Sequence, residues 1–232
     1  MSEAESLIEE ALREGRTKLL EHESYKLLAG HGLPVPEYCL ARSLREVPQC
    51  STRVRYPHVL KVVSPDILHK SDVGGVVLGT RSVEEDLEAY KSIMDSVRTR
   101  APGARVYGVL VQWMVPKGLE VIVGGIRDRF FDIVVMFGLG GVFVEVLRDV
   151  SFRAAPLEYG DAVEMIDDIR ARKILYGVRG MPPRDREAVA RIIYGVYSIM
   201  ERHRNIREID LNPVMSYERG AYIADARIII SK

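Results

Sequence analysis

The sequence is poor in cysteine and has no excess of charge of either sign. Two of its 232 residues are cysteines, and 33 basic residues balance 33 acidic ones, so the formal net charge is zero. A neutral chain has no overall field to attract nucleic acid or an anionic membrane, so any bound anion must be held by local geometry. Cys39 and Cys50 lack CxxC or metal-binding spacing, which favours free thiols in a reducing compartment without excluding a single disulfide.

Long apolar runs are also missing. None approaches the roughly 20 residues that a membrane-spanning helix needs. The N-terminal MSEAESLIEEALREG is acidic and amphipathic, whereas a signal peptide begins with basic residues and continues into an apolar core. With 47% hydrophobic and 28% charged residues, the composition is that of an ordinary folded protein. We therefore expect a protein of the cytoplasm, with neither a membrane nor nucleic acid as a partner.

Several common motifs of nucleotide and metal enzymes are absent. The sequence contains no GxxxxGK[ST] loop, no HExxH, no paired-cysteine zinc pattern and no GxSxG. The glycines of MFGLGGVFVEVL follow an expected strand but precede another strand, whereas a dinucleotide-binding fingerprint opens a helix. These absences exclude a P-loop protein and a Rossmann dehydrogenase.

Hydrophobic periodicity predicts a mixture of helices and strands, and so an α+β protein. Ser82 and Glu85 form a capping box that opens a helix to about Arg98. Four β-rich runs with short links predict an antiparallel sheet, namely RVYGVLVQWMV, GLEVIVGGIRD, FDIVVMFGL and GVFVEVL. The end of the chain predicts a hairpin of two or three strands. Further helices are expected near 7–12, 21–29 and 184–201, and further strands near 37–41, 57–64 and 74–80.

Two charged residues interrupt strands that are otherwise apolar. Lys61 lies within VLKVV, where an ammonium among β-branched neighbours is costly unless it meets an anion such as a phosphate. A lysine on an edge strand facing water is the alternative, and from this residue alone both stay open. Glu120 in GLEVIVGG is a similar case, because its carboxylate can accept hydrogen bonds from ribose hydroxyls.

The tail EIDLNPV contains a candidate metal site. Strand alternation puts Asp210 and Asn212 on one face, with Ile209 and Leu211 on the other. Asp225 falls on the next strand of the expected hairpin, where it can lie beside Asn212. Two oxygen ligands completed by water and phosphate oxygens are how Mg²⁺ is usually held. The same residue types also form turns, but the flanking apolar alternation favours the metal.

Together these motifs resemble the ATP-grasp fold over nearly the whole chain. Their order is Lys61, a glycine-bearing loop, a helix, VQWMVPKGLEV, GLGGVFVEVL, and EIDLNPV followed by Asp225. More narrowly, HKSDVGGV, GLGGVFVEVLRDVSFRAAPL and EIDLNPV are similar to the β subunit of ADP-forming acetate–CoA ligases, relatives of succinyl-CoA synthetase. The resemblance implies two α+β lobes with the nucleotide in the cleft between them. We expect N-terminal helices over residues 1–29, a smaller lobe over about 30–110 and a larger lobe over about 111–232.

The resemblance also implies roles for individual residues. Lys61 would contact the nucleotide phosphates, and Gln112 to Val115 would form the hinge and hydrogen-bond the adenine of ATP or ADP. Glu120 would bind the ribose, and Asn212 and Asp225 would hold Mg²⁺.

His69 occupies the loop SPDILHKSDVGG, where succinyl-CoA synthetase has a glycine-rich loop near the phosphates. The acetate enzymes are thought to use such a histidine as a second phosphate carrier, and a neutral imidazole is a nucleophile near pH 7. Asp210 is the carboxylate expected to orient the imidazole. Gly74 and Gly75 are expected to let the loop move. Without the resemblance, a loop histidine making a local hydrogen bond would be preferred.

The activity implied is phosphoryl transfer within acetyl-CoA + ADP + phosphate ⇌ acetate + CoA + ATP. The sequence has no CoA-binding dinucleotide-like domain, so the resemblance implies a separate CoA-binding α subunit with the first phosphohistidine, in an α2β2 heterotetramer. Another acyl-phosphate ATP-grasp ligase and a non-catalytic nucleotide-sensing module of an acyltransferase are the alternatives. Glu145 and Arg153 are weaker candidates for the phosphate or metal site. The remaining histidines are expected at the surface: His22, His31, His58 and His203.

Overall fold

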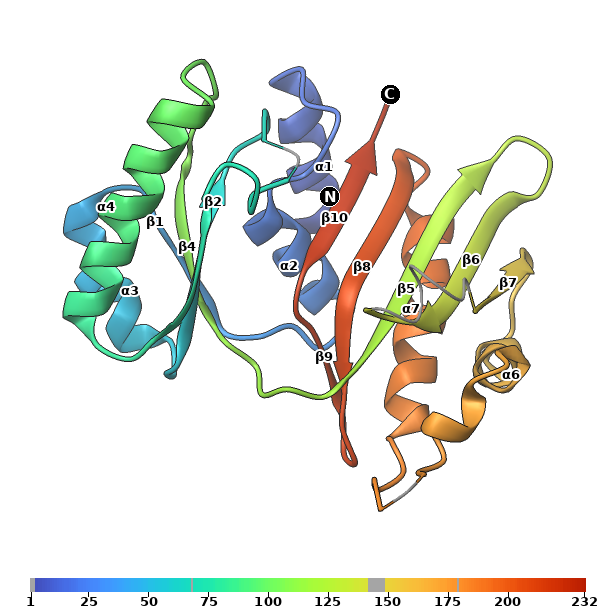
Figure 1. Cartoon of the computed structure of the whole chain (residues 1–232). Helices are drawn as coiled ribbons and strands as arrows, with labels where there is room; N and C mark the ends of the chain where they lie inside the picture. Colours follow the sequence, from blue (N-terminus) through green and yellow to red (C-terminus); the bar gives the residue numbers. More distant parts are fainter. Residues whose placement is uncertain (1–2, 68, 142–148, 179) are drawn as a thin grey trace. The chain divides into compact units, whose positions relative to one another are not determined.

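Two antiparallel sheets organise the chain, and each belongs to a separate unit (Figure 1). The computed structural model describes residues 3–67, 69–141, 149–178 and 180–232. Unit 1 comprises residues up to Leu19, Glu23–Val35 and Pro116–Lys232, and unit 2 comprises Leu20–His22 and Pro36–Val115. None of the helices in these described ranges is long and apolar enough to cross a membrane.

Unit 2 is a two-layer arrangement of one sheet and two helices. Its strand order is β1-β4-β2-β3, with every neighbouring pair antiparallel. Helices α3 and α4 contact each other and pack against this sheet (Figure 1). The element bounds are β1 Tyr38–Ala41, η1 Leu44–Glu46, α3 Val47–Arg53, β2 His58–Val63, β3 Val76–Thr80, α4 Val83–Arg100 and β4 Gly108–Trp113.

Helix α4 begins where the sequence predicts. The hydroxyl of Ser82 accepts a hydrogen bond from the backbone N–H of Glu85 at 3.2 Å, which satisfies one free donor of the first turn. The Glu85 carboxylate accepts from the N–H of Arg81 at 2.8 Å. Ile93 and Val97 are buried on the face that meets the sheet. The capping residues and the apolar stripe therefore agree on the position of this helix.

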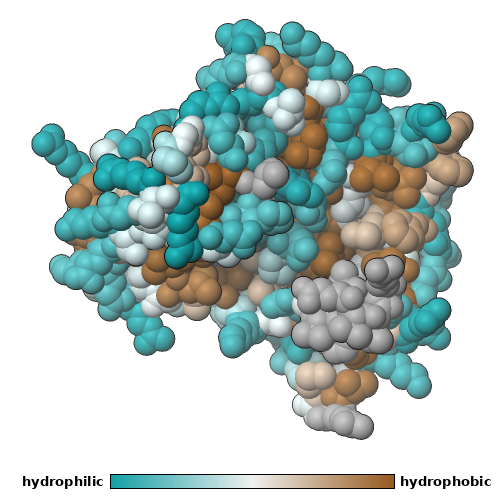
Figure 2. Space-filling model, turned by 45° about the horizontal axis from the view of Figure 1, so that its top comes forward, coloured by the Kyte–Doolittle hydropathy of each residue, from teal (hydrophilic) through white to brown (hydrophobic). Residues whose placement is uncertain are grey.

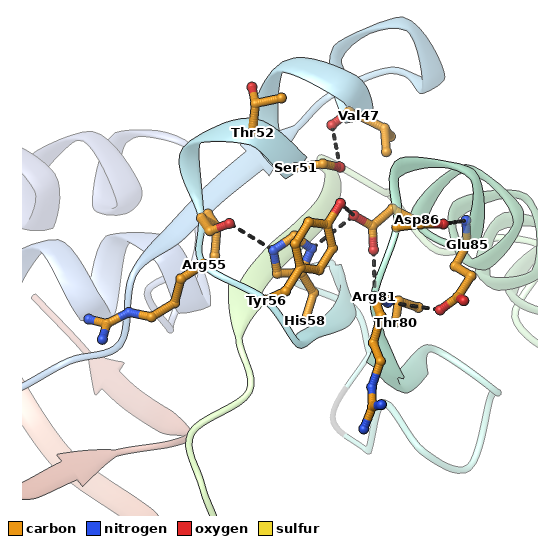
Figure 3. Close-up of polar contacts among 12 residues, drawn as sticks. Val47, Ser51, Thr52, Arg55, Tyr56, His58, Thr80, Arg81, Glu85 and Asp86 are labelled. Carbon is orange, nitrogen blue, oxygen red and sulfur yellow. Dashed lines mark hydrogen bonds and ion pairs between the residues drawn. The ribbon is translucent and has the colours of Figure 1, made fainter.

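A buried polar cluster joins α4 to the start of β2 (Figure 3). The His58 ring Nδ1 lies 2.8 Å from Asp86 Oδ2, and its Nε2 lies 2.9 Å from the Val54 carbonyl oxygen. Both ring nitrogens therefore face an oxygen acceptor. Burial would raise the pKa of Asp86, but hydrogen bonds from His58, Thr80 and Ser51 outweigh it and hold that pKa below its ordinary value. The expectation that His58 lies at the surface is wrong.

Unit 1 is built on a six-stranded sheet with helices against it. The strand order is β10-β8-β5-β6-β7, and β9 also pairs with β8. Helix α7 packs on β5, β6 and β8, while α6 packs on β7 and α7. The bounds are α1 Glu3–Arg13, α2 Glu21–Gly30, β5 Leu119–Asp128, β6 Asp132–Leu139, β7 Val150–Ala154, α6 Tyr159–Asp168, η2 Arg172–Ile174, α7 Arg186–Arg202, β8 Ile206–Ser216, β9 Ala221–Ile223 and β10 Ala226–Ile230.

Glycine allows α7 to approach this sheet closely. A Cβ added to Gly125 on β5 would lie 2.6 Å from Met200 Sδ and 2.7 Å from Val196 Cγ1, closer than side chains can pack. Because side chains alternate along a strand, the residues beside Gly125 point to the opposite face. That face carries Ile126 and Phe152, which are 49% and 54% exposed. Figure 2 shows apolar surface among hydrophilic residues on the side of the molecule where β5 to β7 lie.

The structure confirms most of the expected elements and corrects one grouping. The run RVYGVLVQWMV forms β4, but β4 lies in the sheet of unit 2, whereas GLEVIVGGIRD and FDIVVMFGL form β5 and β6 in unit 1. The expectation of one sheet is therefore wrong for this run, because a short link between two strands does not require that they pair. Most of GVFVEVL falls on residues 142–148, outside the described residues.

The structure also corrects the expectation of free thiols. Cys39 on β1 and Cys50 on α3 form a disulfide that spans 11 positions of the chain. Cys50 is buried. The bridge therefore attaches the first helix of unit 2 to an edge strand of its sheet.

We expect the disulfide to stabilise unit 2 by about 3 kcal/mol, because closing a loop of this size restricts the unfolded chain by that amount. Reduction by a phosphine should lower the melting temperature of the wild type. The C39A/C50A variant should melt near the reduced wild type and should not respond to reductant. Two titratable thiols in the unreduced, denatured wild type would contradict the bridge.

Candidate functional site

The residues predicted to form the site fall into two groups, one in each unit. Unit 2 holds Lys61, His69, Gln112 and Val115, and unit 1 holds Glu120, Asp210, Asn212 and Asp225. Each group is described within its own unit.

Lys61 lies on β2, which has a strand on each side, β4 and β3. The residue is 7% exposed. The alternative of an edge-strand lysine facing water is therefore wrong. Its Nζ lies 2.6 Å from Oε1 of Glu21, so a buried carboxylate partners the buried ammonium. Such pairing is what makes a charge tolerable away from water.

Glu21 was not identified from the sequence, although it contacts two lysines. Its carboxylate is 3% exposed, and its second oxygen, Oε2, lies 2.9 Å from Nζ of Lys70. Lys70 directly follows His69 in the chain. A single carboxylate thus bridges a lysine in the middle of the sheet and a lysine in the histidine loop. A glutamate at the start of a helix usually faces solvent, so no local pattern indicates that Glu21 is buried beside two lysines.

The loop that carries His69 is attached to unit 2 on both sides of the histidine. On one side, Asp66 accepts from the backbone N–H of Arg105 at 2.7 Å and from its guanidinium at 2.8 and 3.0 Å. On the other side, the Gly75 N–H donates to the Lys70 carbonyl at 2.7 Å, and the Val62 N–H donates to Gly75 at 2.8 Å. His69 itself is exposed. The histidine is therefore presented to solvent on a short segment between two fixed ends.

Gly75 has a different structural role from the flexibility expected of it. A Cβ at this position would lie 2.5 Å from Val62 Cγ1 and 2.9 Å from the Lys70 carbonyl oxygen. Gly74 has a φ of 65°, in the region that favours glycine. Gly75 therefore lets the turn pack closely on β2, and Gly74 lets it approach α4, where an added Cβ would lie 3.0 Å from Ser96 Cβ. Movement of the loop stays a prediction.

The expected hinge lies at the end of unit 2. Gln112 is buried on β4, and Val115 is the last residue before the chain enters unit 1 at Pro116. Between them, the backbone N–H of Trp113 donates to Glu37 and that of Met114 donates to Pro57. Those two donors are engaged by the protein itself, so the proposal for adenine rests on Gln112 and Val115.

Glu120 is exposed near the start of β5 and lies against the glycines that follow β6. The Gly140 N–H donates to its carbonyl at 2.7 Å, and a Cβ at Gly140 would lie 2.9 Å from the Glu120 Cβ. Gly141 has a φ of 62°, and a Cβ there would lie 3.2 Å from Glu120 Oε2. The glycines of the GLGG motif therefore leave room for this carboxylate.

The structure confirms that Asp210 and Asn212 share a face of β8, and it corrects the expected strand position of Asp225. Ile209 and Leu211 are buried, whereas Asp210 is half-buried and Asn212 is exposed, so the latter two share the open face of β8. Asp225 lies between β9 and β10. The register on either side of it pairs Val214 with Ile223 and Leu211 with Ala226, which places Asp225 opposite Asn212.

These two side chains offer an amide oxygen on β8 and a carboxylate on the link between β9 and β10. Both are hard oxygen donors of the kind that Mg²⁺ prefers, and the ion usually keeps several waters or phosphate oxygens. Among the described residues no group of three or more histidine, cysteine, aspartate or glutamate side chains could hold a metal. The donor set therefore fits a metal that arrives with its nucleotide, rather than one enclosed by the protein.

Asp210 lies beside Arg227 on β10, whose Nη2 is 3.3 Å from Asp210 Oδ2 and 2.7 Å from Glu208 Oε1. Burial raises the pKa of Asp210, the positive charge of Arg227 opposes this, and the negative charges of Glu208 and Asp225 add to it. The net direction is upward. Asp210 borders a mainly apolar pocket of about 170 Å³, lined in part by Ile126, Met136 and Phe152.

The weaker candidates have other surroundings. Arg153 Nη2 contacts Asp168 Oδ2 at 2.5 Å and Glu164 Oε2 at 3.7 Å, both on α6. Glu145 lies outside the described residues.

His203 is 5% exposed, so its expected place at the surface is wrong. Its Nε2 lies 3.2 Å from that of His31, and burial followed by the charge of His31 lowers the pKa of His203.

Comparisons with known proteins show which family the chain belongs to. The ATP-grasp domain family matches residues 10–230. The β subunit of acetate–CoA ligase (ADP-forming) I from Pyrococcus furiosus is 46% identical over 230 residues, which cover 99% of each chain.

Two solved structures of the dinucleotide-forming acetyl-coenzyme A synthetase 1 of Candidatus Korarchaeum cryptofilum are also similar. One, with coenzyme A, Ca-AMPCP and HgCl⁺, gives 46% identity and a TM-score of 0.95 over 98% of this chain and 100% of that chain. The other, with coenzyme A and Mg-AMPPCP, has its phosphohistidine segment pointing towards the nucleotide-binding site. It gives 42% identity and a TM-score of 0.85 over 98% of this chain and 100% of that chain.

The family match covers nearly every residue, and the identity to the Pyrococcus β subunit is 46% from end to end. Both comparisons assign the chain to the same family. The chain belongs to the ATP-grasp family, among the β subunits of ADP-forming acetate–CoA ligases.

Proposed function

We propose that this chain binds ATP or ADP with Mg²⁺ and transfers a phosphoryl group between the nucleotide and His69. The transfer is one part of the reversible reaction acetyl-CoA + ADP + phosphate ⇌ acetate + CoA + ATP. The observation that carries the proposal is the exposed His69, held beside Lys70 and the buried Lys61–Glu21 pair, in a chain similar to such β subunits from end to end.

Each group of residues has a part in this transfer. Lys61 neutralises charge on the phosphoryl oxygens, and Gln112, Val115 and Glu120 bind the adenine and the ribose. Phosphoryl transfer depends chiefly on positioning and electrostatic stabilisation, so these contacts are the main source of catalysis. Mg²⁺, when bound, neutralises phosphate charge, and Asn212 and Asp225 supply its protein ligands.

His69 supplies the nucleophile. One ring nitrogen attacks the terminal phosphorus, the P–O bond to ADP breaks, and ADP leaves with the bonding electrons. A carboxylate at the other ring nitrogen fixes the tautomer and the ring orientation, and Asp210 is proposed for that role.

The partner in this proposal is a CoA-binding α subunit that carries a phosphohistidine, in an α2β2 heterotetramer. Its support is the similarity to proteins named as β subunits and the phosphohistidine segment of the Korarchaeum enzyme. The acyl chemistry and the nucleotide chemistry would be separated, so a mobile segment must connect them. The proposed substrates ATP, ADP and CoA support a location in the cytoplasm.

Replacing His69 by alanine should abolish labelling of the protein by ATP carrying radioactive γ-phosphate. The wild type should show acid-labile, base-stable label. Nucleotide affinity should stay within about twofold, because His69 is exposed and makes no part of the nucleotide-binding set. The other four of the five histidines remain as internal controls.

In the complex with the α subunit, H69A should also lack acetyl-CoA-dependent ATP synthesis. Undiminished turnover of that complex would contradict the role of His69. An unlabelled wild type that still turns over would instead support an ATP-grasp ligase without a phosphohistidine on this chain.

Replacing Asp225 by asparagine should raise the Mg²⁺ concentration needed for nucleotide binding on the order of tenfold, about 1.4 kcal/mol, because one charged ligand is lost. Titration of nucleotide binding at several Mg²⁺ concentrations measures this. Glu218→Gln, at an exposed position in the β8–β9 turn, is the matched control. Equal loss of binding with and without Mg²⁺ would argue against the metal role.

Replacing Asp210 by asparagine should stop phosphoryl transfer yet slightly stabilise the folded protein at neutral pH. The pKa of Asp210 is raised on folding, so the folded state disfavours its charged form, and the penalty grows as pH rises above about 4. The side chain is 34% exposed, so solvent screening reduces the gain to about 0.5 kcal/mol. Denaturant unfolding at pH 7 and pH 4 checks the sign, because the difference from wild type should shrink at the lower pH.

A further inference from the structure

The carboxylate of Glu21 is shared by two lysines with different tasks in the proposed reaction. Oε1 lies 2.6 Å from the Lys61 ammonium, which is proposed to meet the phosphates. Oε2 lies 2.9 Å from the ammonium of Lys70, the residue after the proposed nucleophile.

Burial makes this arrangement expensive to form and hard to rearrange. Glu21 is 3% exposed at its side chain, Lys61 is 9% exposed and Lys70 is 22% exposed. Removing such charges from water costs several kcal/mol, which good geometry must offset. Water screens buried pairs poorly, so the two contacts hold more firmly than exposed lysine–glutamate pairs.

Lys70 is also fixed through its backbone. Its carbonyl accepts the N–H of Gly75, and Gly75 in turn accepts the N–H of Val62, the residue after Lys61 on β2. The base of the histidine segment is therefore joined to the strand of Lys61 twice, once by backbone hydrogen bonds and once through Glu21. The backbone contacts survive substitution of side chains, which makes the contribution of Glu21 separable.

We propose that Glu21 is a positioning residue, which orients Lys61 toward the phosphates and, through Lys70, sets the place of His69. This inference rests on the proposed function. When no phosphate is bound, the Glu21 carboxylate is a protein partner for the Lys61 ammonium. Because Glu21 is negative, it also opposes the anionic nucleotide, so its contribution to binding and its contribution to transfer have opposite signs.

Substitution of Glu21 should therefore slow phosphoryl transfer without weakening nucleotide binding. Substitution of a purely structural residue should weaken both. Glu21→Gln keeps the size of the side chain but removes its charge. We expect the rate of His69 phosphorylation to fall at least about tenfold, a loss of about 1.4 kcal/mol, whereas Mg-nucleotide should bind at least as tightly as to the wild type. Glu21→Asp keeps the charge and should restore part of the rate.

Lys70→Gln removes the ion pair between Glu21 and the histidine segment and leaves the Glu21–Lys61 pair in place. It should lower the phosphorylation rate by about tenfold and leave nucleotide affinity within about twofold. The E21Q/K70Q variant should be no slower than E21Q alone within about threefold, because both substitutions remove the same contact. Hydrogen exchange of the peptide that contains residues 64–75 should rise in both single variants, which reports on the loop without reference to activity.

Lys26→Gln is the matched control. It breaks a lysine–glutamate pair of similar length, 2.8 Å from Lys26 Nζ to Glu3 Oε1, but one that is 49% and 64% exposed. Its phosphorylation rate and loop exchange should equal those of the wild type.

The outcomes separate this proposal from the function on which it rests. A wild type without label on His69 would overturn both. A labelled wild type with K70Q at the full rate, or a double variant whose loss equals the product of the single losses, would overturn the positioning role alone. If E21Q does not fold, K70Q and its hydrogen exchange still decide the proposal.

Discussion

A lysine buried in the middle of a sheet is the constraint on which the rest of unit 2 depends. Lys61 is flanked by strands on both sides, so its ammonium cannot reach water along the sheet edge. An unpaired charge in that place would be prohibitively costly, and Glu21 supplies the compensating carboxylate. The position of Glu21 then fixes that of Lys70, and through it the base of the histidine loop. One electrostatic requirement therefore organises residues from three separate parts of the chain.

The two faces of the unit 1 sheet have different surroundings. One packs against helix α7, and the other carries the exposed residues Ile126 and Phe152. Helix α7 covers the face of Gly125, where glycine allows close contact with Val196 and Met200. The opposite face is left with Asp210, Asn212 and their polar neighbours. Asp210 is half-buried on this face, and burial raises its pKa, which disfavours the charged form that its proposed role would use. Such local destabilisation is common where a site must be ready for a ligand.

Features that depend on residues close in sequence could be predicted, whereas contacts between distant residues could not. Local patterns were sufficient for the helix opened by Ser82 and for the shared face of Asp210 and Asn212, because capping and strand alternation involve residues close in sequence. The partnership of Glu21 with Lys61 joins residues 40 positions apart, and nothing in either neighbourhood indicates it. The burial of His58 likewise depends on Asp86, which lies 28 positions away. The disulfide was missed because cysteine spacing alone does not reveal which strand and helix will meet.

The glycines of the histidine loop show how one residue type can support two opposite interpretations. Glycine permits motion, and it also permits close packing, so a Gly-Gly pair in a sequence cannot distinguish the two. In the folded chain Gly75 lies against Val62 and Lys70, where any larger residue would collide. Motion of His69 must then come from contacts that can be exchanged. Burial makes the Glu21–Lys70 ion pair hard to exchange, but a phosphate arriving at Lys61, which shares the same carboxylate, would change the charge that holds this pair.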